Sequence, residues 1–302
     1  MTKKIELSKI RDFGELITDS FIFARQNLKP LLSAFFVFCG FFLVAGAITA
    51  SLQQIKVAHS VNSVFDSATA PSSFRSSSYN PFSFFGIEYL LSILFIWLNY
   101  VSMTLVVFSF IALYKEKGNI APTLPEVWGY FKYFFFRILG SSILLAILMG
   151  IAFVLCIIPG IYLYPIMGLV YPIMVFENSS LGYAFNKSFR LIKERWWLTA
   201  GSLFVMFLIL YIATVIIVLP TTIINLSSMF LHPGKGMHLS AVLTIITTLL
   251  QHLCEVLVIL PLITISLCYF NLNEVREGTG LMERISKLGN TKPDDNLAGE
   301  EY

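Results

Sequence analysis

Six long apolar runs limit what this chain can fold into. They cover Leu31–Leu52, Phe84–Leu113, Ile138–Ile158, Ile161–Phe176, Leu198–Leu219 and Leu239–Phe270. A helix rises about 1.5 Å per residue, so about 20 apolar residues cross the hydrocarbon core of a bilayer. Only 13% of the 302 residues are charged, roughly half the share that is usual in a soluble domain. The sequence therefore predicts an all-α integral membrane protein with six transmembrane helices.

Basic residues are distributed unevenly around these runs. Most of the Lys and Arg lie in four segments, which are residues 1–30, 115–137, 177–197 and the tail after Phe270. Six crossings bring all four segments to the same face, and short loops rich in Lys and Arg stay on the cytoplasmic side. We therefore expect both termini to be cytoplasmic.

The segments between the runs differ in composition. Gln53–Ser83 is rich in Ser, Asn and Ala and is typical of a flexible external loop, while Pro159-Gly160 predicts a tight turn between the third and fourth runs. Residues 290–302 are polar and acidic and are predicted to be a disordered cytoplasmic tail. Residues 1–289 are expected to form a single membrane domain.

Two amphipathic segments match each other at a shift of 168 residues. GELITDSFIFARQNLKP begins at Gly14, and GYAFNKSFRLIKERWW begins at Gly182. The shift aligns glycines, serines, phenylalanines and basic residues, in the pairs Gly14 with Gly182, Ser20 with Ser188, Phe21 with Phe189, and Arg25 with Lys193. A weaker third copy precedes the third run, at Leu124–Ile138. This pattern predicts a three-fold repeat of an amphipathic helix and a helical hairpin, with units of about 5–114, 120–176 and 180–272.

Apolar residues recur in both clear copies at the spacing of one helix face. We expect this face and the basic residues beside it to lie in the cytoplasmic interface, against acyl chains and anionic headgroups. The alternative is a collar packed under the helix bundle. The residues assigned to this surface are Phe13, Ile17, Phe21, Arg25, Phe185, Phe189, Lys193, Trp196 and Trp197.

The sixth run holds the main cluster of polar residues, Gln251, His252 and Glu255. His252 and Glu255 are three residues apart, so they share one helix face and are candidates for a proton relay or for two metal ligands. The alternative places them at the external interface, where a charge costs little. The sequence has no P-loop, GxSxG, HExxH or dinucleotide-binding motif, and we expect no catalytic residue, metal or cofactor.

Four helix-breaking residues make the fourth run the most irregular apolar stretch: Pro159, Gly160, Pro165 and Pro172. Broken helices at membrane depth line some transport paths. The alternative is a kinked helix with a packing role, which the absence of charged residues beside the prolines favours.

Three stretches carry a resemblance to a known family: FGELITDSFIFARQNLKPLL, IPGIYLYPIMGLVYPIMVFE and SLGYAFNKSFRLIKERWW. Their Gly, Pro, Ser and Trp positions resemble the membrane domain fused to some bacterial glycerophosphoryl diester phosphodiesterases, and related stand-alone inner-membrane proteins. The resemblance implies a multi-pass protein of the bacterial inner membrane. In the fused members a separate soluble domain performs hydrolysis, so phosphodiesterase activity is not carried over to these residues.

Three hypotheses for function remain open at this point. The first is a non-enzymatic scaffold, accessory subunit or membrane-homeostasis protein whose interfacial helices contact lipid. The second is a transporter or lipid-moving protein with a path near the fourth run and His252/Glu255, and the third is a membrane-embedded enzyme that needs a metal. Membrane lipids and other membrane proteins are the expected partners, and nucleic acid is not.

Overall fold

The computed structural model describes residues 4–69, 86–231 and 240–278, and all regular structure within these ranges is helical. In chain order the elements are α1 (Phe13–Gln26), α2 (Leu28–Thr69), α3 (Ile87–Glu116), α4 (Leu124–Leu155), α5 (Ile157–Phe176), α6 (Leu181–Ile192), α7 (Trp196–Leu231), α8 (Ala241–Cys254), the 3-10 helix η3 (Glu255–Val258) and α9 (Ile259–Glu277).

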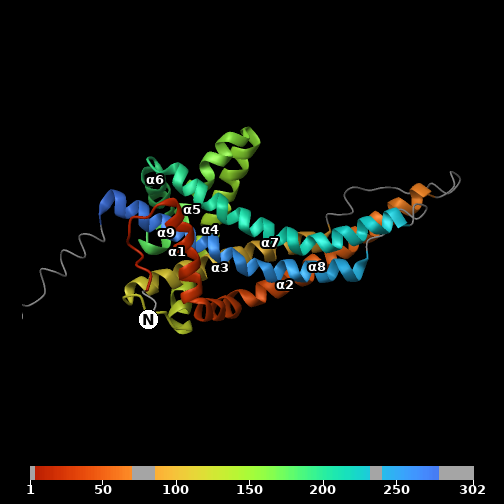
Figure 1. The fold of residues 1–302 in the computed structure, drawn as a ribbon, viewed down its shortest axis with the longest axis horizontal. Coiled ribbons are helices and arrows are strands. Elements are labelled where there is room, and N and C mark those ends of the chain that lie inside the picture. The colour runs from red at the N-terminus through yellow and green to blue at the C-terminus, as the bar shows by residue number, and fades with distance from the viewer. Residues whose placement is uncertain (1–3, 70–85, 232–239, 279–302) are drawn as a thin grey trace, which may run out of the picture.

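Helices α2, α3, α7 and α8 lie side by side in an elongated bundle (Figure 1). Helix α9 continues α8 toward the end of the molecule where α1 and α6 lie. Six segments are long and apolar enough to cross a membrane: α2, α3, α4, α5, α7 and the combined α8–η3–α9. The chain therefore has the helical composition of a multi-pass membrane protein.

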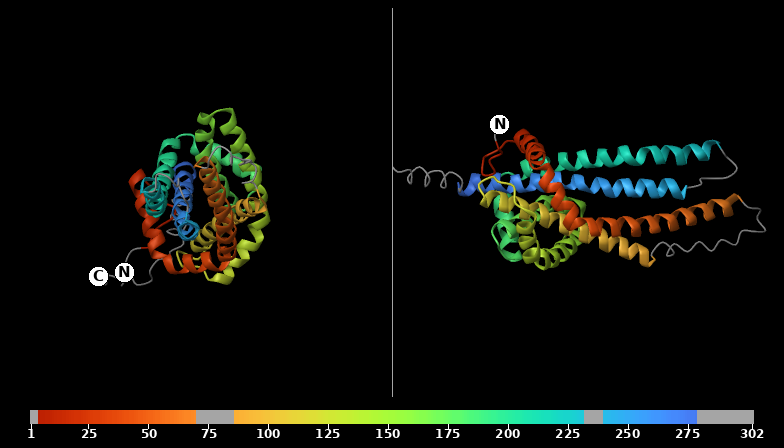
Figure 2. Two further views of the ribbon diagram at one scale, coloured as in Figure 1. Left: turned by 90° about the vertical axis from the view of Figure 1, so that its right-hand side faces the viewer. Right: turned by 90° about the horizontal axis from the view of Figure 1, so that it is seen from below.

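The α4–α5 hairpin runs crosswise to the long bundle, as both views in Figure 2 and the view in Figure 1 show. Large apolar side chains at its tip are exposed, including Val154, Leu155 and Ile158. Contiguous apolar surface of this kind is unfavourable in water and costs nothing in hydrocarbon. The hairpin is apolar enough to cross a membrane, although its direction differs from that of six parallel crossings.

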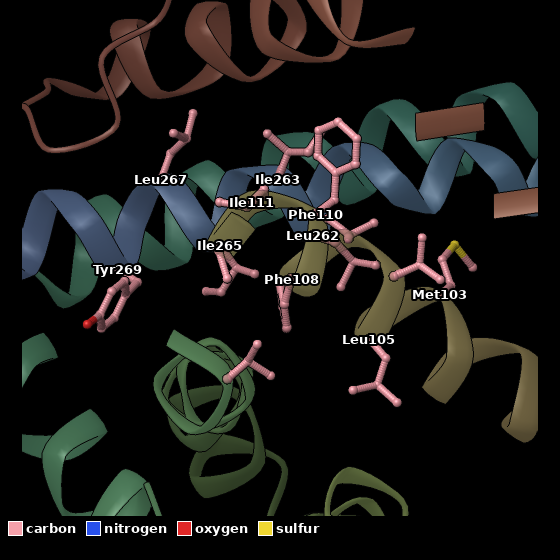
Figure 3. Close-up of a cluster of buried hydrophobic side chains, with 14 of the residues drawn as sticks. Met103, Leu105, Phe108, Phe110, Ile111, Leu262, Ile263, Ile265, Leu267 and Tyr269 are labelled. Atoms are coloured by element: carbon pink, nitrogen blue, oxygen red, sulfur yellow. The ribbon is translucent and has the colours of Figure 1, made fainter. Parts of the chain in front are cut away.

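The main core surrounds the second half of α3, which contacts α2, α4, α5 and α9. From Val101 to Tyr114 every residue of α3 is buried, so this helix is enclosed on all sides. Figure 3 shows Leu105 and Phe108 of α3 beside Leu262 and Ile265 of α9. This junction fixes the positions of the helices that carry the candidate site.

Two segments beyond the ends of the predicted apolar runs are helical. Helix α2 continues to Thr69, because Gln53–Thr69 contains no Gly or Pro and includes several good helix formers. Helix α7 continues through Pro220 to Leu231, and the Thr221 and Thr222 hydroxyls donate to the Val218 carbonyl in the turn that the proline loosens. The predicted external loop at Gln53–Ser83 therefore begins too early.

The predicted turn at Pro159-Gly160 is wrong by three residues. The chain turns at Cys156, whose backbone is extended, and Pro159 and Gly160 lie in the first turn of α5. A proline is tolerated there because the first amides of a helix have no intrahelical partner. Pro165 and Pro172 lie inside α5, which runs unbroken to Phe176, so none of these four residues ends the helix.

The interrupted segment is the sixth apolar run, which the sequence predicts as one helix. It contains a 3-10 turn at Glu255–Val258, between α8 and α9. Pro261 explains the break, because its ring clashes with the carbonyl of Leu257 in a regular α-helix. The predicted tail, residues 290–302, lies outside the described residues.

Candidate functional site

Helix α1 has one face in the protein and one face outside it. Leu16, Ser20 and Phe23 are fully buried, while Phe21 is 39% exposed and Arg25 is exposed on the opposite side. Asp12 and Glu15 form a capping box that starts the helix. Of the residues predicted for the interface, Phe21 and Arg25 lie on the face of α1 that the bundle leaves open.

Part of the predicted interfacial face of α1 packs against other helices of the protein. Phe13 is 42% exposed, yet its ring lies close to Gly201 of α7, where an added Cβ would be 3.2 Å from Cε2. Ile17 is half-buried. The outward surface of α1 is thus centred on Phe21 and Arg25.

A buried arginine anchors the segment before α1. The Arg11 guanidinium donates to Asp19 Oδ2 at 2.8 Å, to the Leu7 carbonyl at 2.8 Å, and to the carbonyl of Glu6. Ser20 adds a second anchor, because its Oγ accepts a hydrogen bond of 2.9 Å from Thr264 Oγ1 of α9. These contacts hold α1 in a fixed rotation about its axis.

Helix α6 is held by a buried lysine. Lys187 Nζ lies 2.9 Å from Glu177 Oε1 and 3.1 Å from Glu277 Oε1, and its side chain is nearly inaccessible. Burial lowers the pKa of this ammonium, but the two carboxylates outweigh burial and the pKa is raised. Tyr269 also donates to Glu177, at 2.6 Å.

The predicted interfacial residues of the second copy divide into two groups. Phe185 and Phe189 contact each other with ring centroids 5.0 Å apart and pack against the core. Trp196 is half-buried, and its Nε1 donates to the Tyr162 carbonyl at 3.0 Å. Only Lys193 and Trp197, which is 83% exposed, face away from the protein.

The polar residues of the sixth run face the interior of the bundle at the helix break. His252 is 7% exposed, and its Nδ1 lies 2.9 Å from the Thr248 carbonyl. His252 Nε2 lies 3.8 Å from Glu255 Oε1, while Gln251 is half-buried on the same helix. The spacing of three residues therefore places the histidine and the carboxylate together, as predicted from the sequence.

Two other helices complete this cluster. Asn99 of α3 is buried, and its Nδ2 donates to Glu255 Oε2. Gly46 of α2 lies beside the imidazole, since a Cβ added there would be 3.7 Å from Nε2. We refer to Gly46, Asn99, His252 and Glu255 as the polar cluster.

A separate apolar cavity of about 360 Å³ lies where α3, α4, α5, α7 and α9 meet. Its lining is aromatic and aliphatic, and the hydroxyl-bearing residues in it are Tyr100, Tyr164, Tyr171 and Ser142. Val258 and Pro261, at the helix break, also line it. This volume lies within the usual range for pockets that bind small molecules, about 300–1,000 Å³.

Residues that commonly bind metals do not gather elsewhere in the described ranges. No group of three or more His, Cys, Asp or Glu side chains could hold a metal ion within them. The cysteines Cys39, Cys156, Cys254 and Cys268 are free thiols. No protein-family model, curated protein or solved structure matches the chain, so the family resemblance remains an expectation from the sequence.

Proposed function

We propose that the chain is a non-enzymatic, multi-pass protein of the bacterial inner membrane with cytoplasmic termini. In this role it is a scaffold, an accessory subunit or a membrane-homeostasis protein that contacts lipid through α1 and the start of α7. The observation that carries the proposal is the two-faced packing of α1, in which Leu16, Ser20 and Phe23 are buried while Phe21 and Arg25 are exposed.

An aromatic ring beside a basic side chain fits the boundary between acyl chains and anionic headgroups. Arg25 and Phe21 supply this pair on α1, and Lys193 and Trp197 supply it at the α6–α7 junction. Each exposed basic residue near an anionic surface contributes about 1 kcal/mol to binding. The ligand expected here is therefore an anionic lipid at the membrane surface.

The internal repeat is part of the same proposal, with units of about 5–114, 120–176 and 180–272. At the shift of 168 residues, Phe13 and Leu181 both start a helix, and so do Leu28 and Trp196. The buried positions also coincide, in the pairs Leu16 with Ala184, Ser20 with Ser188, and Phe23 with Leu191. The middle unit, residues 120–176, differs, because its amphipathic part is continuous with α4.

Fluorescence quenching by lipid tests the proposed contact. A variant with Trp197 as its only tryptophan, reconstituted in vesicles that contain brominated anionic lipid, is expected to show strong quenching. Aqueous iodide is expected to have little effect. The opposite result, quenching by iodide and not by brominated lipid, would remove the basis of the proposal.

Lipid retention provides a second measurement. Native mass spectrometry of protein released from mild detergent should show fewer anionic lipid adducts for the double variant R25Q/K193Q. The matched control is K56Q, because Lys56 belongs to α2 and is paired with Glu88 of α3, so it lies on neither α1 nor the α6–α7 junction. Equal loss of adducts in both variants would contradict the assignment to α1 and the α6–α7 junction.

A second candidate function is a transporter or lipid-moving protein. The specific observation in its favour is the apolar cavity, which Val258 and Pro261 line at the interrupted sixth run. Ala146→Phe would fill this cavity from α4. Movement of a fluorescent lipid between leaflets of proteoliposomes should be lost in A146F, and unchanged transfer would count against this function.

A further inference from the structure

The polar cluster contains buried acceptor atoms without enough donors. The Thr248 carbonyl can only accept, so the His252 Nδ1 that contacts it at 2.9 Å carries a hydrogen. In a neutral imidazole this tautomer leaves a lone pair on Nε2. That atom is buried and has no hydrogen-bond partner, and the same is true of Asn99 Oδ1.

The nearest polar atom to this lone pair belongs to an acid. Glu255 Oε1 lies 3.8 Å from Nε2, and its other oxygen accepts from Asn99 Nδ2. If the carboxylate were ionised beside a neutral imidazole, two acceptors would face each other, and a side chain that is only 25% exposed would carry a negative charge without compensation. Burying an unpaired charge in this way is costly.

Charged and titratable groups on the neighbouring helices do not supply the compensation. Helix α2 brings Cys39 near the pair, but a thiol carries no positive charge; farther along it, Lys56 is bound to Glu88 of α3 at 2.6 Å, and His59 is exposed. Helix α3 adds Tyr100, and α7 adds Tyr211, which is mostly exposed. Within the part of the chain that the structure describes, no lysine or arginine is paired with Glu255.

We propose that His252 and Glu255 together hold one proton, with Asn99 fixing the carboxylate. The proton comes from solvent hydronium, whose O–H bond breaks to leave water, and it adds to the lone pair of Nε2 or to an oxygen of Glu255. Either placement supplies the missing donor between the two side chains and makes the pair neutral as a whole. This site goes beyond the proposed function, since it exists whether the chain contacts lipid or moves it.

The backbone at the site supports a functional assignment. Glu255 begins the 3-10 turn that separates α8 from α9, and short breaks in regular helices often occur at functional positions. Gly46 allows α2 to approach the imidazole closely. Ionisable residues inside a membrane bundle commonly mark proton or ion paths, and this pair lies where α8 passes into the 3-10 turn.

The protonation state of His252 in lipid nanodiscs tests the proposal. Nitrogen NMR of isotope-labelled histidine at neutral pH reports protons on the ring, and infrared spectroscopy reports a carboxylic acid at Glu255. We expect either an imidazolium beside a carboxylate or a neutral ring beside a protonated acid, which is one proton in both cases. A neutral His252 beside an ionised Glu255 would overturn the proposal.

Variants test whether the His252 signal depends on Glu255 or on other groups of the bundle. E255Q should change the His252 signal, while E88Q, which removes another carboxylate of the bundle, should leave it unchanged. H252Q assigns the signal; if that variant does not fold, replacement of His59, His232 and His238 assigns it by elimination. A His252 signal that responds to added Zn²⁺ or Na⁺ at constant pH would show a metal site instead and would also overturn the proposal.

Discussion

The side chain of Asn271 exchanges two hydrogen bonds with the backbone of Arg11, at opposite ends of the described chain. Its Oδ1 accepts from the Arg11 amide at 3.0 Å, and its Nδ2 donates to the Arg11 carbonyl at 3.2 Å. One asparagine thus satisfies both backbone groups of a buried residue. This contact attaches the N-terminal segment to α9.

Asn271→Ala should therefore destabilise the protein. The change leaves a buried amide and a buried carbonyl of Arg11 without partners, and each such group costs about 1–3 kcal/mol. A lower thermal midpoint in detergent, followed by intrinsic fluorescence, measures the effect. The control is N186A, because Asn186 is exposed on α6; equal midpoints for the two variants would mean that the contact carries no stability.

Arg11 itself provides a second prediction. The variant R11M removes the charge and leaves Asp19 and three backbone carbonyls without their donor. We expect the free energy of unfolding to fall by about 3 kcal/mol. R11K should recover only part of the stability that R11M loses, since an ammonium cannot reach all the groups that the planar guanidinium reaches. R25K, at an exposed position, should be close to neutral. Full recovery of the chemical unfolding midpoint by R11K would contradict the role of guanidinium geometry.

The apolar runs predict the existence of the long helices but not all of their limits or directions. Hydropathy reports that a segment belongs in hydrocarbon, and it contains no information on the direction of the helix axis. The crosswise α4–α5 hairpin therefore could not be predicted. The turn at Cys156 was missed because Pro159-Gly160 is the stronger local turn signal.

Contacts between distant residues limited the prediction of the candidate site. The spacing of His252 and Glu255 places them on one face, but Asn99 comes from a helix 156 residues earlier. From the sequence, Lys187 is expected to face lipid headgroups like the other basic residues of its segment. No local pattern shows that Glu177 and Glu277 enclose it. The buried face of α1 includes Ser20, whose polarity alone suggests exposure.

Alkaline pH should weaken the attachment of α6. Lys187 has a raised pKa in the folded protein because Glu177 and Glu277 outweigh the effect of burial. Its contribution to stability is fully present below the pKa of the unfolded chain, about pH 10, and is lost as the pH rises through the folded pKa. Thermal unfolding as a function of pH measures this loss, which should be absent in K187M.

The same experiment with K193Q controls for general alkaline damage, because Lys193 is exposed. K193Q should retain the alkaline decline that the unchanged protein shows. A decline of equal size in K187M would mean that other lysines or tyrosines produce it.

Gly160 gives a test of the hairpin geometry. A Cβ at this position would lie 2.5 Å from Cδ1 of Phe153 on α4, so the ring must move to admit a methyl group. Overpacking of this kind costs about 1–3 kcal/mol, which exceeds the gain of up to about 1 kcal/mol from replacing a helical glycine by alanine. We expect G160A to lower the thermal midpoint.

Gly182 is the matched control, because a Cβ there meets no atom within 4 Å. G182A should raise the midpoint slightly through helix propensity alone. The double variant F153A/G160A should be more stable than the sum of the two single changes predicts, since removal of the ring removes the clash. If G160A is stabilising, as expected for G182A, the Phe153 ring turns away at little cost and does not fix the close packing of α4 on α5.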